Sequence, residues 1–315
     1  MILVTAKISE KYHKDLIQAF PNETFTFCDD ISQATDELPQ AEIIVTYGED
    51  LTDEHIEKAS QLKWIMVLSA GVDQLPHQAI KKHHILVTNV RGIHKIPMAE
   101  YAIAMLLQVY RQAKTLIKHQ MEGKWERSIK MQEISARTMV ILGTGAIGQE
   151  VARLAKAFHI KTIGVSRSGK PVEFFDETYQ TSDLHQQLPD ADFVVSVLPS
   201  TPETKYLFTE ESFRLLPNHA VFLNMGRGDI VKSDVLLQAI QNKEIAHAVL
   251  DVFEEEPLPE NHPLWQEENI TITPHLSGIS PQYVPRALNI FKENLNKYRG
   301  KEQPLINEVD VSRGY

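Results

Sequence analysis

Short apolar runs alternate with segments of helical periodicity along almost the whole chain. In the first 90 residues the runs are 2–5, 24–27, 43–46, 64–68 and 85–88, and from residue 138 onward they are 138–142, 161–165, 193–198, 220–225, 247–253 and 270–273. Strands that alternate with helices predict parallel sheets covered by helices on both faces. The pattern therefore predicts an α/β fold of two doubly wound parallel-sheet domains, with six strands in the second.

Two longer helical patterns connect these groups of strands. Residues 97–120 begin with a proline and lead from the first group to the second, while residues 121–137 are polar and predict an irregular connection. A last helical pattern at 282–297 returns the chain toward the first group. A length of 315 residues fits two domains. We therefore predict one domain from residues 1–98 and 282–315, with residues 99–281 inserted as the second.

The strand predicted at 138–142 runs into a glycine-rich turn and then into a helical pattern. The turn residues are Gly143, Thr144, Gly145, Ala146, Ile147 and Gly148. A strand, this glycine spacing and a helix are together typical of a dinucleotide-binding domain. Gly143 makes the turn, Gly145 lets the backbone approach a pyrophosphate, and Gly148 lets the helix pack closely on its strand. The first N–H groups of the helix then face the phosphates.

Three chemically useful side chains follow late strands of the second group. Arg227 comes after the run 220–225, Glu256 after 247–253, and His275 after 270–273. Open α/β sheets bind ligands at the carboxyl ends of their strands. An arginine flanked by glycines is sterically free to bind a carboxylate with its planar fork. A histidine beside a carboxylate has its charged form favoured, which makes it a proton donor near neutral pH.

The composition excludes several classes of partner. The net charge of −10 argues against nucleic acid and anionic membranes, and no apolar run is long enough to span a membrane. The single cysteine, Cys28, excludes an internal disulfide framework and fits a reducing compartment. The N-terminus has no basic leader, so it predicts a first strand rather than a signal peptide. We predict a cytoplasmic protein.

The motifs together resemble the D-isomer-specific 2-hydroxyacid dehydrogenases, and the match extends over nearly the full chain. The motifs are Ser69-Ala70-Gly71-Val72-Asp73, the glycine turn 143–148, Leu198-Pro199-x-Thr201-Pro202-Glu203-Thr204, Asn224-x-Gly226-Arg227-Gly228, Leu250-Asp251-Val252-Phe253-x-x-Glu256-Pro257 and Thr273-Pro274-His275. The resemblance implies a Rossmann cofactor domain inserted into a flavodoxin-like substrate domain. It also implies a small 2-keto or 2-hydroxy acid as substrate.

The resemblance further implies a role for each site residue. Arg227 binds the substrate carboxylate, Glu256 raises the pKa of His275, and His275 protonates the carbonyl oxygen as hydride arrives from the nicotinamide. The backbone of Ala70 and Gly71 holds the other side of the carboxylate. The residues implied to contact the cofactor outside the glycine turn are Pro199 on the adenosine side, Thr204, Asp251 at the nicotinamide amide, His275 and Gly278.

The residues after the second strand of the cofactor domain indicate which cofactor is used. NAD-dependent members of the family usually have an acidic residue there for the ribose hydroxyls. This chain has Ser166, Arg167 and Ser168 instead, followed by Lys170, with no acid before Glu173. An arginine with hydroxyl neighbours fits a 2′-phosphate better than a ribose diol. We predict a preference for NADPH, with NADH possible, as in glyoxylate/hydroxypyruvate reductases.

Three other classes within the same superfamily remain to be compared. Formate dehydrogenases have glutamine at the position of Glu256, which disfavours that class. In phosphoglycerate dehydrogenases we expect a regulatory domain after the last helix, where this chain has only a short polar segment, and basic residues for the substrate phosphate. Corepressor-type binding proteins keep the fold and the catalytic residues but carry extra tails for partners, where we expect only a short polar segment here, and steady turnover on a 2-keto acid would separate them from an enzyme. The resemblance and the apolar stretch Met105–Tyr110 both predict a homodimer.

Overall fold

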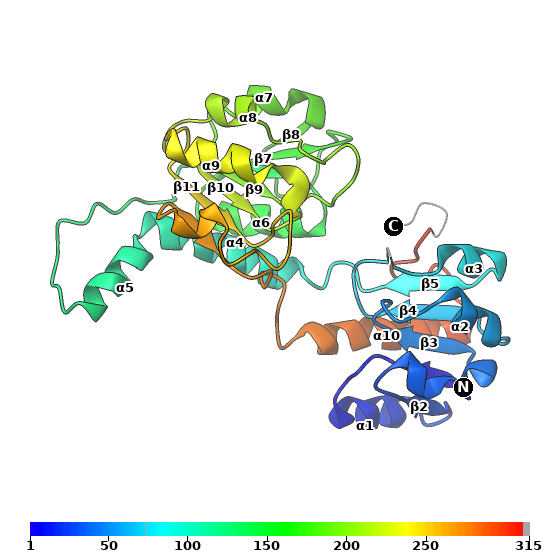
Figure 1. The fold of residues 1–315 in the computed structure, drawn as a ribbon. Helices are drawn as coiled ribbons and strands as arrows, with labels where there is room; N and C mark the ends of the chain where they lie inside the picture. Colours follow the sequence, from blue (N-terminus) through cyan, green and yellow to red (C-terminus); the bar gives the residue numbers. More distant parts are fainter. Residues whose placement is uncertain (73, 311–315) are drawn as a thin grey trace. The chain divides into compact units, whose positions relative to one another are not determined.

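The computed structural model describes residues 1–72 and 74–310, so Asp73 of the first motif and the last five residues lie outside the described part. The chain divides into two compact units (Figure 1). Unit 1 consists of Met1–Ile93 and Ser280–Tyr315, and unit 2 of His94–Ile279. The sequence placed these divisions at residues 98 and 282. The first division comes earlier because the helix predicted to start at residue 97 already begins at Lys95 and packs within unit 2.

Unit 1 is a five-stranded parallel sheet with the order β2-β1-β3-β4-β5. Its strands are β1 (Ile2–Val4), β2 (Phe25–Phe27), β3 (Ile43–Thr46), β4 (Trp64–Val67) and β5 (Leu86–Asn89). One face is covered by α1 (Glu10–Ala19) and α10 (Tyr283–Gly300), the other by α2 (Asp53–Lys58) and α3 (His77–Lys82) (Figure 1). This strand order is that of the flavodoxin-like fold.

Unit 2 is a seven-stranded parallel sheet with the order β12-β11-β10-β9-β6-β7-β8. Its strands are β6 (Thr138–Leu142), β7 (Lys161–Ser166), β8 (Glu177–Gln180), β9 (Phe193–Ser196), β10 (Val221–Asn224), β11 (His247–Leu250) and β12 (Ile270–Ile272). Read from β8 inward, this is the Rossmann order with one further strand at the far edge. The two predicted doubly wound parallel sheets are therefore confirmed.

Helices cover both faces of the sheet of unit 2 (Figure 1). One face packs against α4 (Lys95–Tyr110) and α6 (Ala146–Ala157), and the other against α7 (Leu184–Gln187), α8 (Glu210–Leu215) and α9 (Ser233–Gln241). The short 3-10 helices of the chain are η1 (Ile31–Ala34), η2 (Leu38–Gln40), η3 (Thr181–Asp183), η4 (Gly228–Ile230) and η5 (Pro263–Gln266). Within the described residues, no helix is both long and apolar enough to cross a membrane.

Two predictions about the elements were wrong. The strand β8 was missed, because its sequence Glu177-Thr178-Tyr179-Gln180 has no apolar run and its residues are only half-buried at the edge of the sheet. The helix predicted over 97–120 is two helices, α4 and α5 (Ala113–Met121). They are separated at Gln112, whose φ of 53° is left-handed and ends the first helix.

Candidate active site

The glycine turn after β6 leaves open space at the start of α6. Gly143 has a φ of +105°, which favours glycine. A Cβ on Gly148 would lie 1.9 Å from the carbonyl oxygen of Gly143, so the turn and the helix touch there. In contrast, a Cβ on Gly145 would meet nothing within 4 Å. Because Gly145 is the N-cap of α6 and no side chain caps the helix, the first N–H groups face this open space.

The residues after β7 provide polar groups without partners. The Oγ atom of Ser166 is buried and has no hydrogen-bond partner in the part of the chain that the structure describes. Arg167 is exposed and makes no hydrogen bond or ion pair with the described residues, although its charge helps to lower the pKa of the Glu203 carboxyl. A second hydroxyl, that of Ser168, accepts a hydrogen bond from the Lys170 amide at 3.4 Å. These groups are available to a ligand at the end of β7.

Strands β10, β11 and β12 end in register, and this alignment places the predicted catalytic residues. Asn224, the last residue of β10, pairs with Leu250 of β11, which pairs with Ile272 of β12. Arg227 and His275 each stand three residues beyond this aligned row. Since parallel strands carry their carboxyl ends to one edge of the sheet, both residues follow that edge.

The glycines beside Arg227 are required by packing, which corrects the reason given from the sequence. A Cβ on Gly226 would lie 2.6 Å from the carbonyl oxygen of Leu198, and one on Gly228 would lie 1.9 Å from the carbonyl carbon of Phe253. The glycines therefore let neighbouring segments approach the backbone, rather than freeing the arginine side chain. The Arg227 Nη1 atom donates to the carbonyl oxygen of Gly226 at 2.8 Å.

The structure joins Glu256 to His275. The Nδ1 atom of His275 lies 2.7 Å from Oε2 of Glu256, and the other carboxylate oxygen accepts a bond from the Phe253 amide at 2.9 Å. The side chains of His275 and Glu256 are 54% and 35% exposed. Because Nδ1 faces the carboxylate, Nε2 is the nitrogen left for a substrate. His275 has a φ of 50°, a conformation that costs a residue with a Cβ roughly 1–2 kcal/mol.

A buried carboxylate holds the segment that carries His275. Asp251 is fully buried, and its Oδ1 atom accepts bonds from the Thr273 hydroxyl at 2.5 Å and the Leu276 amide at 2.9 Å. Its Oδ2 atom accepts a bond from the Ser277 amide at 3.0 Å. The sequence assigned Asp251 only a contact with the nicotinamide amide, which stays a prediction.

The remaining predicted cofactor residues lie in local turns. The Thr204 hydroxyl donates to the carbonyl oxygen of Pro199 at 2.7 Å. The carbonyl oxygen of Gly278 lies 3.3 Å from Nδ1 of His94, and a Cβ on Gly278 would lie 2.9 Å from the same atom. Burial lowers the pKa of His94, and the charge of Arg227 lowers it further. Sequence analysis missed His94, because a lone histidine before a helix carries no motif.

The predicted substrate loop, Ser69 to Val72, lies in unit 1. Its carbonyl oxygens are held by side chains: Asn89 Nδ2 donates to Ala70 at 2.9 Å and Ser69 Oγ to Gly71 at 2.7 Å. The amide groups of Ala70 and Gly71 donate to no acceptor among residues 1–72 and 74–310. Both amides are thus open, and their contact with an anion or with the substrate stays a prediction.

Comparison with known proteins gives the family. Residues 103–277 match the family model described as D-isomer specific 2-hydroxyacid dehydrogenase, NAD binding domain. This chain belongs to that family. A family member from Aeromonas salmonicida subsp. salmonicida A449 has a solved structure that is similar over 98% of both chains, with 36% identity and a TM-score of 0.87.

Two further relatives carry more specific names. The NADPH-dependent glyoxylate/hydroxypyruvate reductase of Sinorhizobium meliloti, solved with NADP and sulfate, is 28% identical with a TM-score of 0.81, over 100% of this chain and 99% of that one. A D-3-phosphoglycerate dehydrogenase of Methanocaldococcus jannaschii is 30% identical over 81% of this chain, which spans 49% of that protein. The protein is therefore an oxidoreductase of the 2-hydroxyacid dehydrogenase family that acts on a CH–OH group.

The residues of unit 2 fit the nicotinamide dinucleotide that this family binds. The open space over Gly145 and the uncapped start of α6 suit a pyrophosphate, because N–H groups and the helix dipole favour an anion there. At the end of β7, the orphaned Ser166 hydroxyl and the Arg167 guanidinium suit the substituents of the adenosine ribose.

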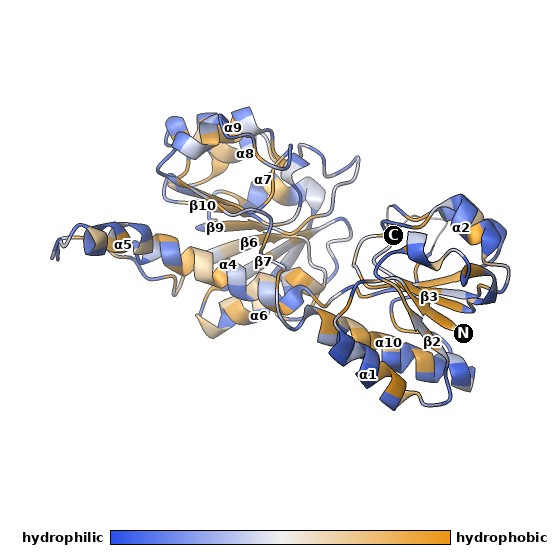
Figure 2. Cartoon of the chain, turned by 60° about the horizontal axis from the view of Figure 1, so that its bottom comes forward, coloured by the Kyte–Doolittle hydropathy of each residue, from blue (hydrophilic) through white to orange (hydrophobic). Residues whose placement is uncertain are grey.

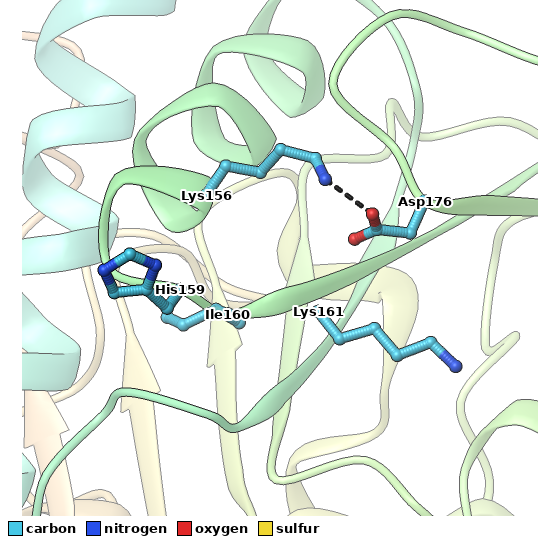
Figure 3. A pocket seen from close by; sticks show the side chains of 5 residues that line it. All are labelled: Lys156, His159, Ile160, Lys161 and Asp176. Atoms are coloured by element: carbon cyan, nitrogen blue, oxygen red, sulfur yellow. Dashed lines mark hydrogen bonds and ion pairs between the residues drawn. The ribbon is translucent and has the colours of Figure 1, made fainter.

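A hollow elsewhere in unit 2 does not belong to this site. It is lined by Lys156, His159, Ile160, Lys161 and Asp176, at the opposite end of α6 from the glycine turn (Figure 3). Its lysines already have partners, since Lys156 pairs with Asp176 at 2.5 Å and Lys161 with Glu177 at 2.7 Å. The hollow therefore has little charge left with which to bind a small acid.

Proposed function

We propose that this dehydrogenase reduces a small 2-keto acid of the glyoxylate or hydroxypyruvate type to the D-2-hydroxy acid, with NADPH as the hydride donor. The observation that carries the proposal is the 2.7 Å contact between His275 and Glu256, together with Arg227, which follows a strand that ends in register with the strand before His275. A proton donor, a carboxylate that favours its charged form and an arginine are the groups that this reduction needs.

Each residue has a separate part in the proposed reaction. The guanidinium of Arg227 binds the substrate carboxylate and polarises the carbonyl oxygen. When bound, the reduced nicotinamide supplies a hydride to the carbonyl carbon. The Nε2 atom of His275 gives its proton to the carbonyl oxygen, so the C=O double bond becomes a C–O single bond with one new C–H and one new O–H bond, and the imidazole is left neutral. The Glu256 carboxylate orients the imidazole through Nδ1 and stabilises the imidazolium before the transfer.

The substrate assignment is tested with a panel of keto acids. The parent protein is assayed on glyoxylate, hydroxypyruvate, pyruvate and 3-phosphohydroxypyruvate with each nicotinamide cofactor. The last compound tests the second candidate, a phosphoglycerate dehydrogenase, which the Methanocaldococcus relative favours. Highest kcat/KM on the phosphorylated acid would reject our substrate class, and no turnover on any acid would favour a cofactor-sensing binding protein.

The catalytic roles are tested by two substitutions. We expect His275→Ala to lower kcat about 10²–10⁴-fold, because a general acid commonly contributes that much. Arg227→Ala removes the carboxylate anchor and should both raise KM and lower kcat. Near-normal turnover of the His275→Ala protein at neutral pH would show that another group gives the proton.

The cofactor assignment rests on the residues after β7. A 2′-phosphate would bind the free guanidinium of Arg167 and the hydroxyls of Ser166 and Ser168, and charge-assisted bonds are the stronger kind. A hydrogen bond to a charged group contributes about 1.5–3 kcal/mol, so Arg167 supports roughly 10- to 100-fold discrimination against NADH.

The cofactor test compares kcat/KM with NADPH and NADH in the parent and in Arg167→Ala. The control is Arg153→Ala, which removes an equally charged surface side chain of α6 that is already paired with Glu150. Arg167→Ala should lose the preference and the control should keep it. Equal use of both cofactors by the parent would mean that residues 166–170 form an ordinary surface turn and not a site for the 2′-phosphate.

We keep the cytoplasm as the proposed location, because the chain has a single cysteine.

A further inference from the structure

A chain of three side-chain groups ends beneath the segment that carries His275. The hydroxyl of Tyr101, on α4, lies 2.7 Å from Oγ1 of Thr273, and that hydroxyl lies 2.5 Å from Oδ1 of Asp251. A carboxylate oxygen only accepts hydrogen bonds, so the single proton of Thr273 points to Asp251. Tyr101 must then be the donor to Thr273, and the direction of the whole chain is fixed.

Asp251 holds the backbone of His275 and of the two residues that follow it. Its side chain accepts the amides of Leu276 and Ser277, and its main-chain carbonyl accepts the His275 amide at 2.9 Å. Together with the Thr273 hydroxyl, this one buried residue therefore holds four residues of the segment from Thr273 to Ser277. The segment needs such support, because His275 holds a left-handed backbone conformation that a residue with a Cβ rarely adopts.

Tyr101 is suited to complete this support. It is 9% exposed, and burial raises its pKa to about 12, so its hydroxyl stays protonated at any working pH. It belongs to the core between the sheet and α4, which lies beside α6 in both Figure 1 and Figure 2. Without its hydroxyl, Thr273 would lose a donor in a region where water is scarce, which is costly for a polar group.

We propose that Tyr101 is a positioning residue for the reduction, which acts through Thr273 and Asp251 to hold His275 in the orientation for proton transfer. The proposal rests on the proposed role of His275 as the proton donor. No motif in the sequence marks Tyr101, and it lies more than 170 positions from His275 along the chain. The hydrogen bonds alone connect the two.

The first test is Tyr101→Phe, which removes the hydroxyl and keeps the ring. One hydrogen bond contributes modestly, so kcat should fall about 2- to 12-fold. The KM for the keto acid and the Kd for the cofactor should change by less than a factor of about two, because the Tyr101 hydroxyl bonds Thr273 and acts on His275 rather than on a ligand. The matched control is Tyr110→Phe on the same helix, whose buried hydroxyl has no hydrogen-bond partner among the described residues. The control should keep the parent kcat.

The second test distinguishes the effect of the hydrogen bonds from Tyr101 through Thr273 to Asp251 from a general effect on packing. Thr273→Val should lower kcat more than Tyr101→Phe, and Thr273→Ser, which keeps the hydroxyl, should restore most of it. The double variant Tyr101→Phe/Thr273→Val should equal Thr273→Val alone, because both changes break the same chain.

Three results would overturn the proposal: a parent-like kcat for Tyr101→Phe, effects that multiply in the double variant, or no recovery with Thr273→Ser. A failure of the proposed function is visible separately. In that case the parent would not reduce keto acids, or His275→Ala would stay active, whatever the Tyr101 variants do.

Discussion

Two glycines of the same turn should respond to alanine in opposite ways. Gly148→Ala places a methyl group 1.9 Å from the carbonyl oxygen of Gly143, and neither backbone can yield without moving α6 from β6. Gly145→Ala places a methyl group where nothing lies within 4 Å, and its φ of −74° is ordinary for alanine. Gly148→Ala should therefore lower the stability of the folded protein, whereas Gly145→Ala should lower only the affinity for a ligand.

The expected magnitudes differ accordingly. Overpacking commonly costs 1–3 kcal/mol, and each kcal/mol shifts Tm by about 2–4 °C in a domain of this size, so Gly148→Ala should lower Tm by roughly 2–12 °C. Gly145→Ala should leave Tm within about 1 °C of the parent. If the pyrophosphate occupies the open space, the same 1–3 kcal/mol appears as a 5- to 150-fold weaker affinity for the cofactor.

The assay measures Tm by calorimetry without cofactor and Kd for NADPH by titration calorimetry on the same preparations. Unchanged cofactor affinity in Gly145→Ala would refute the assignment of the open space to the pyrophosphate. An unchanged Tm in Gly148→Ala would refute the close contact between turn and helix. Each variant is the control for the other, because they exchange the same hydrogen for a methyl group three residues apart.

Three further predictions concern catalysis, stability and assembly. Glu256→Gln should lower kcat in steady-state assays of keto-acid reduction, because the imidazole of His275 loses the carboxylate that lies 2.7 Å from its Nδ1 atom and orients the ring. Arg299→Ala should destabilise the protein by about 1 kcal/mol at pH 7 in urea denaturation. The hydrogen bonds of Arg299 lower the pKa of Glu42 below its usual 4.5, so this difference should be present above pH 4.5 and shrink as pH falls. Light scattering at micromolar concentration should give the mass of a dimer for the parent protein. Ile117→Lys on α5 should give the mass of a monomer, whereas the control Ile17→Lys on α1, a residue of similar exposure, should remain a dimer.

The reason for the dimer prediction has shifted with the structure. The apolar residues of α4 that first suggested it are largely covered within unit 2, where Leu106 and Tyr110 are buried. A group of uncovered apolar residues lies instead on α5 and the segment after it, which project away from the rest of unit 2 (Figure 2). They are Leu116, Ile117, Met121, Trp125 and Met131, with Trp125 92% exposed.

The sequence predicted both sheets because buried parallel strands are nearly continuous apolar runs. All residues of β6 after Thr138 are buried, and so are all residues of β9 and β10. The same rule missed β8, which is polar and half-buried at an edge. It also extended several strands, since Leu198, Met225 and Phe253 are apolar but follow the strand ends. A run of apolar residues indicates which residues are buried, but the hydrogen-bonded pairing of a strand can end before its buried residues do.

The candidate site also has a part that the sequence indicates, its exposed charged residues, and a part that only the structure shows, the buried residues that hold them. Arg227, Glu256 and His275 could be proposed from the sequence because a reacting group has to be charged or titratable and reach solvent; His275 is 54% exposed, and the catalytic roles stay predictions. The residues that hold them are buried: Asp251 shows no exposed surface, and Ser277 only 4%. Sequence reasoning gave Asp251 a role toward the cofactor, because an acid after a strand is visible as a ligand. Its bonds to three residues around His275 depend on how two neighbouring strands end, which no spacing along the chain encodes.

This division also explains why the histidine can be both exposed and ordered. An exposed imidazole on a left-handed residue would ordinarily sample several orientations, since little surrounds it. Here the backbone is fixed from below by a buried carboxylate, and the ring is fixed at Nδ1 by Glu256, whose own position is set by the Phe253 amide. Only Nε2 faces outward without a constraint from these contacts. The proposed proton donor is therefore oriented without the substrate, and this preorganisation is what a change in Tyr101 or Asp251 should remove while the chemistry of the imidazole stays intact.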